Sequence, residues 1–485
     1  MTKNWFRIGL VSIFILSLAL RFWGLDRFNT LVFDEVYYAK FGNNYLVHVS
    51  FFDGHPPMGK LMIALGIWLG SHIPFWHDSV NGLTGSLRSP WDYRWMNAFC
   101  GSFIPLLIAG IAYQLSSRRS FALIAGLFTA LDGIFIVESR YALINIYIVI
   151  FGLLGQLLLL LALNHQKQKR QLFLFIAGVA FGCSVATKWN GLFFLAGIYF
   201  LWIFAWIWQI LAKKINPSNG DEELNQPASS PLQKLTQLYG WQMLLFLGII
   251  PTIIYRLIWI PHLKLDTKYG FIEVHKQILA FHERLGGNNA QVHPYCAAWY
   301  KWPLLTRPMA YYYQTAQSAS APLPVFGPNL PANAGKIVYD VHAMGNPFLW
   351  WFGIAAIVFL LGMLIASMVK FWQQQKRLIL PKHLTVDTWI ALYLVVNYAT
   401  NLAPWIKVTR CAFIYHYMTA VVFAFLAIAW FVDQCLRSYY PPLPVIGVAI
   451  SLMILAAFVF WLPIYLGLPI TSEGYRLRMW FNSWI

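Results

Sequence analysis

Long apolar stretches, separated by short polar segments, run through most of the chain. A helix needs about 20 apolar residues to cross a hydrocarbon core. The pattern therefore predicts eleven membrane-spanning helices, at residues 5–24, 95–115, 121–137, 142–163, 172–187, 190–212, 241–260, 347–371, 386–404, 412–433 and 443–466. The first stretch lacks a small-residue cleavage site, so we expect it to be retained as a span rather than removed as a signal peptide.

The basic residues between these stretches indicate how the spans are oriented. If eleven spans alternate, the basic residues of the short connections all fall on one side, namely Arg118, Arg119, Lys167, Lys169, Arg170, Lys213, Lys214, Lys376, Arg377 and Arg437. Because Lys and Arg in short loops collect on the cytoplasmic side, we expect the N-terminus in the cytoplasm and the C-terminus outside. The two long loops then also lie outside.

The same pattern divides the chain into three regions. An N-terminal membrane region at residues 1–260 includes the first outer loop, 25–94, and is followed by the second outer loop, 261–346, and a C-terminal membrane region, 347–485. In the first loop the stretch MGKLMIALGIWLG is too short to span, so we expect a helix in the membrane interface. The polar segment 213–238 has the composition of a flexible linker. No internal repeat supports an inverted-repeat transporter.

Composition agrees with a membrane protein and narrows its partners. The 485 residues are 59% hydrophobic and 11% charged, with a mean hydropathy of +0.56, against roughly 25% charged residues in a soluble domain. The net charge of +17 comes from scattered basic residues without a nucleic-acid-binding motif, so we expect anionic lipid or a phosphate-bearing substrate and no nucleic acid. The five cysteines lie far apart without a CxxC, which indicates neither a metal cluster nor a disulfide framework, and most are expected to be buried small side chains.

Ionisable residues at the ends of the expected spans gather on the outer side. Five separate outer segments present cations there, among them Arg21, Arg94, Arg140, Lys188, Lys407, Arg410 and His416. Together they would create a field that favours an anionic group at the membrane surface, such as a lipid phosphate. Each has a structural alternative, because an arginine at a span end often anchors the helix in the interface, and Lys188 and Glu138 could equally be structural ions.

Two other polar features of the outer side are expected to be structural. His275 and His282 stand seven residues apart, but no carboxylate or third histidine at ligand spacing accompanies them, so we predict no metal site. Asp132, near an outer helix end, is expected to be a hydrogen-bonded structural group.

Asp34 and Glu35 are the most informative pair in the chain. Two adjacent carboxylates between the apolar TLVF and the aromatic VYYAKF would be costly to bury without partners or a function. In a partly dehydrated site rich in cations, one of them could accept a proton from a hydroxyl as its oxygen attacks an electrophilic carbon, while arginines stabilise a departing phosphate. This arrangement suits glycosyl transfer from a lipid phosphate, although position and charge alone would also suit a proton-coupled transporter.

Several segments resemble the protein O-mannosyltransferases. The first outer loop carries VFDEVYYAKFGNNYL followed by FFDGHPPMGKLMIALG, and the similarity continues along nearly the whole chain in YRWMNAFCGSFIPLL, SRYALINIYIVIF, TKWNGLFF, HPYCAAWYKWPLLTRPMAYYY, MGNP and RCAFIYHYMTA. The resemblance implies a C-type glycosyltransferase (GT-C) fold with eleven spans and transfer of mannose from a polyprenyl phosphate to Ser or Thr. The reaction would be inverting, with neither cofactor nor nucleotide sugar.

The resemblance also implies roles for individual residues. Asp34 and Glu35 fall on the family's acidic pair, with Asp34 the favoured base, and Arg21 and Arg94 fall on arginines that the family uses around its active site. Weaker candidates for binding the donor phosphate are Arg140, Arg410, His55, Lys60, Lys188 and His416.

The chain departs from the family pattern in two places. The second outer loop is too short for the β-trefoil insert of eukaryotic members, so the chain is similar to the prokaryotic form. The family usually has an Asp where SRYALIN places Asn145, which puts the acceptor or the sugar in doubt more than the reaction type.

We therefore expect a multi-pass enzyme of the bacterial plasma membrane that moves mannose from a polyprenyl-phosphate carrier to Ser or Thr of proteins outside the cytoplasm. The alternatives are a related transferase with a lipid or glycan acceptor, and a transporter without covalent chemistry.

Overall fold

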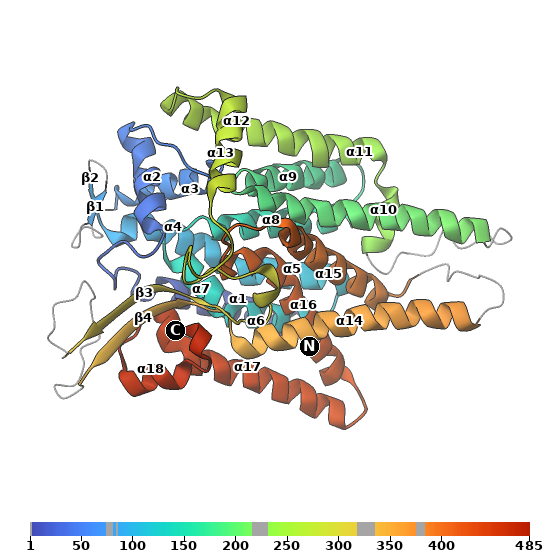
Figure 1. The fold of residues 1–485 in the computed structure, drawn as a ribbon. Helices are drawn as coiled ribbons and strands as arrows, with labels where there is room; N and C mark the ends of the chain where they lie inside the picture. The colour runs from blue at the N-terminus through green and yellow to red at the C-terminus, as the bar shows by residue number, and fades with distance from the viewer. Residues whose placement is uncertain (1, 74–80, 84–85, 216–230, 318–334, 375–383) are drawn as a thin grey trace.

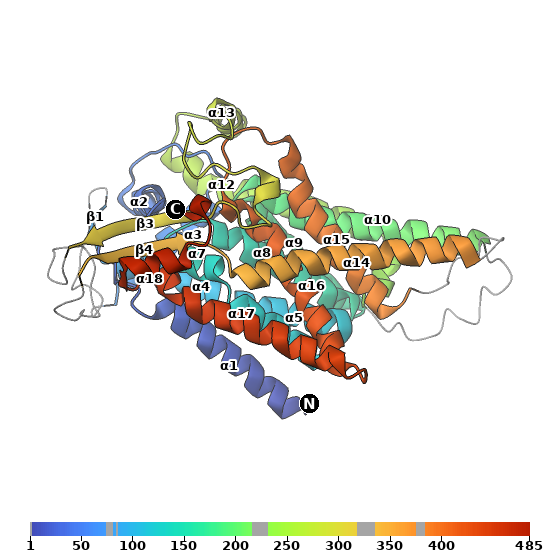
Figure 2. The same cartoon turned by 60° about the horizontal axis from the view of Figure 1, so that its bottom comes forward.

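A bundle of long helices makes up most of the molecule (Figures 1 and 2). The computed structural model describes all residues except 1, 74–80, 84–85, 216–230, 318–334 and 375–383. The long helices are α1 (Lys3–Phe22), α4 (Pro90–Ser102) with α5 (Ile104–Ser116), α6 (Arg119–Ala130) with α7 (Gly133–Arg140), α8 (Asn145–Leu163), α9 (Lys167–Val185), α10 (Leu192–Ile215), α11 (Gly240–Leu244) with α12 (Ile250–Leu265), α14 (Pro347–Gln374), α15 (Val386–Leu402), α16 (Met418–Arg437) and α17 (Pro442–Leu466).

Each of the eleven expected spans is helical at about the expected residues. Within the described residues, eight helices are long and apolar enough to cross a membrane, or nine if α6 and α7, bent by 59°, form one span. The other two expected spans are α9, which begins with the polar KQKRQ, and α15, which has 17 residues. Most of the expected linker 213–238 lies outside the described residues.

The remaining elements gather at one end of the bundle, at the left in Figure 1. We call this the loop-bearing end, and it comprises α2 (Glu35–Val47), α3 (Met58–Gly70), α13 (Phe271–Arg284), α18 (Ser472–Arg478), β1 (Asn81–Leu83), β2 (Ser86–Arg88), β3 (Met309–Ala316), β4 (Ile337–Ala343) and β5 (Ile470–Thr471). The expected short helix of the first loop is α3, which is too short to span.

Two small antiparallel sheets depart from the expected all-helical chain. Strands β1 and β2 pair with each other, and β3, β4 and β5 form a second sheet in that order. The sequences MAYYYQTA and IVYDVHA of β3 and β4 are rich in the aromatic and β-branched residues that favour strands. Between Ala310 and Tyr312 the β3 register shifts in a bulge, a device that redirects a side chain.

Helix α16 runs through the centre of the bundle. Its alanines, including Ala420, Ala424 and Ala427, are fully buried, and small residues let neighbouring helices approach closely. A Cβ added at Gly353 of α14 would lie 3.1 Å from the Cβ of Ala424, so the two helices touch at small residues.

The break between α6 and α7 is stabilised by Asp132, which caps α7. Its carboxylate accepts hydrogen bonds from the backbone N–H groups of Phe135 and Asn346, at 3.2 and 3.0 Å, and from the indole N–H of Trp350, at 2.7 Å. The prediction that Asp132 is a hydrogen-bonded structural group is confirmed. Since α7 carries Glu138 and Arg140, this cap also places two charged groups at the loop-bearing end.

Candidate active site

The acidic pair lies where the chain enters α2. Phe33 has a positive φ of 52°, which is costly for a bulky residue and marks a site that surrounding contacts hold in place. Its ring stacks on that of Tyr311, with centroids 4.0 Å apart. Asp34 is the N-cap residue of α2 and Glu35 is its first helical residue, so the two carboxylates leave the backbone in different directions.

Glu35 is completely buried and fully hydrogen-bonded. Its oxygens accept hydrogen bonds from the backbone N–H groups of Val32 and Ala142, both at 2.8 Å, and from Nε and Nη2 of Arg94, at 2.9 and 2.8 Å. Four donors occupy the carboxylate. Glu35 therefore joins the first loop to α4 and to the segment after α7.

Arg94 is also fully occupied. Besides its two bonds to Glu35, it donates from Nη1 to the carbonyls of Leu25 and Phe28 and from Nη2 to that of Thr30, at 2.7 to 2.9 Å. A guanidinium has five N–H donors, and all five have partners. The side chain is 0% exposed, so Arg94 holds the entry to the first loop in shape.

Arg140 and Arg21 lie nearby and are likewise buried. Arg140 donates to the carbonyls at the end of α1, those of Leu20, Arg21, Trp23 and Gly24, at 2.7 to 3.2 Å. These carbonyls have no partner within the helix, so Arg140 caps α1. Arg21 donates to the carbonyl and hydroxyl of Ser17, at 3.3 and 2.7 Å, and its Nε and Nη2 have no partner among the described residues.

Asp34 differs from its neighbour because its carboxylate has no hydrogen-bond partner among the described residues. It does not cap its own helix, and it is half-buried. Burial raises the pKa of Asp34 to about 6, an increase that the charge of Lys188 opposes and that of Asp53 reinforces. A carboxylate with such a pKa and free oxygens can accept a proton.

Lys188 is the cation that faces this carboxylate. Its Nζ donates to Oδ1 of Asn145 at 2.7 Å and lies 5.2 Å from the ring centroid of Tyr415. Burial lowers the pKa of Lys188 to about 8, and the charges of Asp34 and Glu138 limit the decrease. Lys188 is 5% exposed and borders a cavity.

The cavity measures about 230 Å³ and is lined by segments far apart in the sequence. Its walls are Gly54, His55, Pro56, Lys188, Trp189, Asn190, Phe193, Leu279, His282, Pro404, Trp405, Val408, Arg410 and His416. Four predicted phosphate-binding residues therefore meet here, namely His55, Lys188, Arg410 and His416. Two of them are basic side chains and two are histidines packed among aromatic rings.

Lys60, another predicted phosphate ligand, does not line the cavity. Its buried Nζ donates to the carboxylate of Asp53 and, at 2.7 Å, to the carbonyl of His55. Lys60 thereby fixes the DGHPP turn whose next residues form one wall of the cavity.

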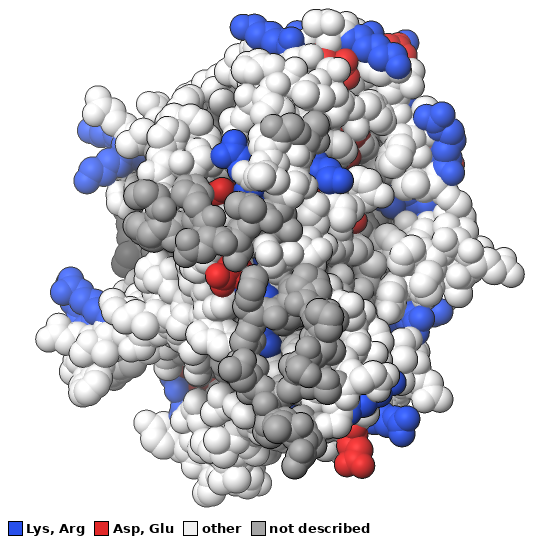
Figure 3. Space-filling model, turned by 90° about the vertical axis from the view of Figure 1, so that its left-hand side faces the viewer, with Lys and Arg blue, Asp and Glu red and all other residues white. Residues whose placement is uncertain are grey.

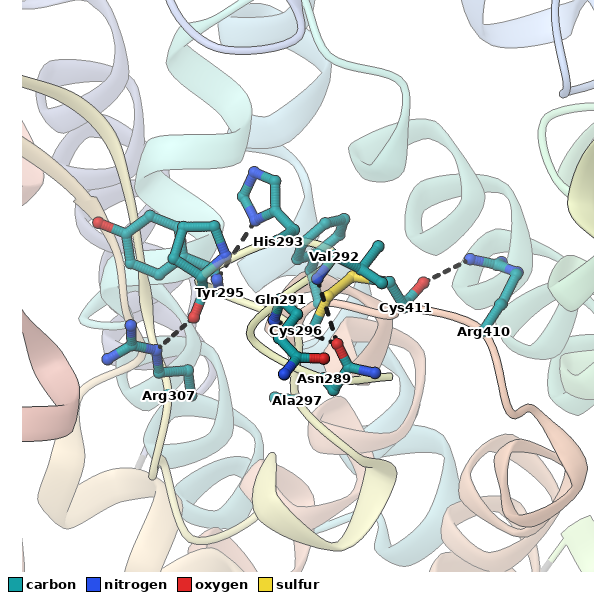
Figure 4. Close-up of a disulfide and its surroundings, with 12 residues drawn as sticks. Asn289, Gln291, Val292, His293, Tyr295, Cys296, Ala297, Arg307, Arg410 and Cys411 are labelled. Carbon is teal, nitrogen blue, oxygen red and sulfur yellow. Dashed lines mark hydrogen bonds between the residues drawn. A yellow bond between two sulfur atoms is a disulfide. The ribbon is translucent and has the colours of Figure 1, made fainter. Parts of the chain in front are cut away.

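A disulfide joins Cys296 to Cys411 beside this cavity, so the expectation that the cysteines form no disulfide is wrong (Figure 4). The two cysteines are 115 residues apart in the sequence, and such a spacing does not indicate that they pair. Backbone bonds reinforce the link, from Cys411 N–H to the Gly286 carbonyl and from Ala297 N–H to the Ala412 carbonyl, at 2.8 and 2.9 Å. Cys100, Cys183 and Cys435 are free. Cys435 is buried, as expected of a small core side chain, whereas Cys100 and Cys183 are only half-buried.

Arg410 is held next to this disulfide. Its Nη1 donates to the carbonyl of Cys411 at 3.0 Å, as Figure 4 shows, and its backbone bridges to Gly287. The disulfide joins the second long loop to the segment after α15, and it thereby positions the guanidinium of Arg410 at the cavity.

Some residues around the cavity were not predicted as site residues. Trp189 and Trp405 line it. His282, considered only as a metal ligand, lines it too, and its Nε2 donates a hydrogen bond to the Gly54 carbonyl at 2.9 Å. Tyr311 of β3 stacks on Phe33. Only the run YYY within a resembling segment marks Tyr311, and the others come from segments whose meeting no local pattern indicates.

The surface of the loop-bearing end is mixed in charge. Basic side chains lie mainly around its edge, and a few acidic ones lie nearer the middle (Figure 3). In the part of the chain that the structure describes, no group of three or more His, Cys, Asp or Glu residues could hold a metal ion.

Fold and site together define the class of protein. The fold superimposes on the yeast protein O-mannosyltransferase Pmt1–Pmt2 complex bound to its sugar donor with a TM-score of 0.77, at 15% identity, covering 100% of this chain and 93% of that one. The chain has the GT-C fold of multi-span membrane glycosyltransferases.

The family follows from the sequence. Residues 11–265 match the family model of dolichyl-phosphate-mannose-protein mannosyltransferases, and residues 267–484 match the C-terminal four-span region of protein O-mannosyltransferases. The chain belongs to the protein O-mannosyltransferase family and is a protein mannosyltransferase with a lipid-phosphate-mannose donor. This assignment replaces the transporter alternative.

Similar proteins occur in bacteria and animals. The polyprenol-phosphate-mannose–protein mannosyltransferase of Mycolicibacterium smegmatis is 23% identical, over 94% of this chain and 88% of its own length, and that of Corynebacterium glutamicum is 22% identical over 89% and 81%. Rat protein O-mannosyl-transferase 1 is 28% identical over 59% of this chain and 37% of its own.

Proposed function

We propose that the enzyme transfers mannose from polyprenyl-phosphate-mannose to Ser or Thr hydroxyls, with inversion at the anomeric carbon and Asp34 as the general base. One observation carries the assignment of the base. Of the two adjacent carboxylates, Glu35 is saturated by four donors, whereas Asp34 has no hydrogen-bond partner among the described residues and lies within electrostatic reach of Lys188.

The chemistry follows from this division. Asp34 takes the proton of the acceptor hydroxyl while the hydroxyl oxygen bonds to the anomeric carbon on the face opposite the phosphate. The bond from that carbon to the phosphate oxygen breaks, and the electron pair leaves with the polyprenyl phosphate. A single displacement of this kind turns a β-linked donor into an α-mannoside. The base contributes typically 10² to 10⁴ in rate.

We assign the leaving phosphate to the cavity cations. Lys188 and Arg410 border the cavity and would stabilise the charge that develops on the phosphate. His55 and His416 line the same space, and burial together with nearby cations holds the pKa of His55 well below its usual range, so that His55 acts as a neutral hydrogen-bonding group. Trp189 and Trp405 offer flat apolar faces to a sugar or prenyl group.

The remaining predicted residues position this machinery. Arg94 and Glu35 brace the loop that carries Asp34, Arg140 caps α1 with Arg21 beside it, and Lys60 fixes Asp53. Their buried hydrogen bonds account for charged side chains that do not border the cavity.

We propose that the site faces the outside of a bacterial plasma membrane, with the N-terminus in the cytoplasm and the C-terminus outside. The basic short connections support this orientation. The disulfide at the loop-bearing end supports it as well, because disulfides persist in oxidising compartments and are rare in the cytosol.

The test uses purified enzyme with radiolabelled polyprenyl-phosphate-mannose and membrane proteins as acceptors. We expect label in protein that β-elimination releases, in the α configuration, and Asp34→Asn to lower the rate by at least about 100-fold with donor binding retained. Asp266→Asn, at a turn of the same end, is the matched control and should keep the wild-type rate. Label found only in lipid would support the alternative of a lipid or glycan acceptor, and wild-type turnover by Asp34→Asn would remove Asp34 as the base.

A further inference from the structure

A buried polar chain leads from β3 to the active-site lysine. The hydroxyl of Tyr311 donates to Oε1 of Glu138, Nδ2 of Asn145 lies 3.2 Å from both Glu138 oxygens, and Nζ of Lys188 donates to Oδ1 of Asn145 at 2.7 Å. None of the four residues is more than 7% exposed. They come from β3, α7, the start of α8 and the segment before α10, so tertiary structure alone brings them together.

Asn145 separates two opposite charges in this chain. Glu138 and Lys188 are both buried, yet they form no ion pair within 4.0 Å, because the amide of Asn145 stands between them. An amide is suited to this place since it offers a carbonyl to the ammonium and an N–H group to the carboxylate. Direct pairing of the two ions, which the low dielectric of the interior would favour, does not occur.

The ammonium of Lys188 consequently keeps donors available. It has three N–H groups, and within the described chain only Asn145 accepts a hydrogen bond from it. Lys188 lines the cavity, and the charge of the Asp34 carboxylate acts on its ammonium.

A carboxylate at position 145, where the family usually has an Asp, would in this chain stand beside Glu138 and change the arrangement in two ways. It would pair directly with Lys188 and cancel the charge offered to the cavity. It would also lose the N–H group that donates a hydrogen bond to Glu138. Two carboxylates would then lie side by side, which favours protonation of one of them.

We propose that Asn145 is a positioning residue that keeps the ammonium of Lys188 free of an ion pair, so that this ammonium serves the donor phosphate and Asp34. The inference rests on the proposed function, in which Lys188 stabilises the leaving phosphate.

A pH dependence of donor handling follows from all the charges around Lys188. Asp34 and Asp53 come from the first loop, Glu138 from α7, and Arg410 from the segment after α15, while His55, His282 and His416 also border the cavity. One more anion among them raises the pKa of both Asp34 and Lys188. The pH profile of kcat/KM should therefore move to higher pH on both sides.

The first test compares the full-length wild-type enzyme with Asn145→Asp, using polyprenyl-phosphate-mannose as the donor. We expect the KM for the donor to rise about tenfold, as for the loss of one charge-assisted hydrogen bond, and the acidic limb of kcat/KM to move up by about one pH unit. Wild-type KM together with a wild-type pH profile would overturn the proposal.

The second test is the double variant Glu138→Gln with Asn145→Asp. It restores the net charge and lets an amide again donate to a carboxylate, so a merely structural role of Asn145 predicts that the wild-type KM returns. Because Lys188 still meets a carboxylate, we expect the raised KM to persist at a normal melting temperature. This variant also keeps the proposal testable if Asn145→Asp alone fails to fold, and recovery of the wild-type KM would refute the proposal.

The two hypotheses fail separately. If the wild-type enzyme transfers no label from polyprenyl-phosphate-mannose to protein, the proposed function is wrong. If it does, and the double variant has the wild-type KM, only the role of Asn145 is wrong.

Discussion

The guanidinium of Arg94 and the carboxylate of Glu35 form two parallel hydrogen bonds, at 2.9 and 2.8 Å, and neither side chain is exposed to solvent. Paired arginine and carboxylate groups of this geometry are the strong ones among charged hydrogen bonds. Since removal of one partner leaves the other as an uncompensated buried charge, the pair decides whether the first loop folds.

Arg94→Ala should therefore destabilise the enzyme by about 3 to 5 kcal/mol. The thermal stability of detergent-solubilised protein would measure the effect. Arg284→Ala on α13 is the control that stays near wild type, because the Arg284 Nε donates to the Ala280 carbonyl of its own helix. A stable Arg94→Ala enzyme that has lost only donor affinity would show instead that Arg94 binds the phosphate.

The pH dependence of kcat/KM should be bell-shaped. Asp34, with its pKa raised to about 6 by burial, must lose its proton to act as a base, so activity rises as the pH increases through that value. Lys188, with its pKa lowered to about 8 by burial, must keep its proton to face the phosphate, so activity falls above that value. Lys188→Arg should move the alkaline limb beyond the accessible range, and an unchanged alkaline limb would show that another group titrates there.

Two basic residues of one segment allow a matched comparison. Arg410 lines the cavity and Lys407, three residues earlier, does not. Arg410→Ala should raise the KM for the donor by about tenfold, as expected for one lost charge-assisted contact, whereas Lys407→Ala should leave it unchanged. Equal effects of the two changes would mean that the overall positive charge of the segment matters and not the position of Arg410.

Reduction of the disulfide should displace Arg410 and so weaken donor binding. Because Cys296–Cys411 holds the segment that carries Arg410, treatment with dithiothreitol or Cys296→Ser should lower the donor affinity several-fold. Cys183→Ser, which removes a free cysteine, should have no effect. Identical donor affinity in the oxidised and reduced enzymes would show that backbone hydrogen bonds suffice to hold Arg410.

Activity should persist in the presence of a chelator. The described residues offer no group of three or more metal-ligating side chains, and the charge of the leaving phosphate can be met by Lys188 and Arg410. Measurement of transfer before and after EDTA would check this, and loss of activity that a divalent ion restores would contradict it.

The sequence predicts the helices of the spans well and singles out the acidic pair as a candidate site, because both are local properties. A run of apolar residues is long enough to cross a membrane whatever it packs against, and two adjacent carboxylates beside such a run are unusual in any fold. The resemblance to a family predicted the protein mannosyltransferase activity, and the matches of residues 11–265 and 267–484 to models of that family confirmed it.

The partners of the charged residues could not be predicted in the same way. Arg94 and Lys188 are both isolated cations in the sequence. Among the described residues, however, Arg94 has five hydrogen-bond acceptors and Lys188 has one. Which carbonyls and carboxylates surround a cation depends on contacts between segments far apart in the chain. The same reason hid the disulfide, whose two cysteines meet only after the second long loop folds against the segment after α15.

The positive φ of Phe33 precedes the turn that places Asp34 before α2 and Glu35 at its first position. The order of these two residues therefore matters, although their charges are the same. Asp and Glu differ by one methylene group, and exchanging them would leave charge, composition and hydropathy unaltered. Yet the longer side chain is the one that reaches four donors, and the shorter one is left without any among the described residues. The order of the two residues therefore decides their roles. If they were exchanged, the side chain at position 35 would be too short to reach the four donors, and the carboxylate at position 34 would be displaced by about one bond length.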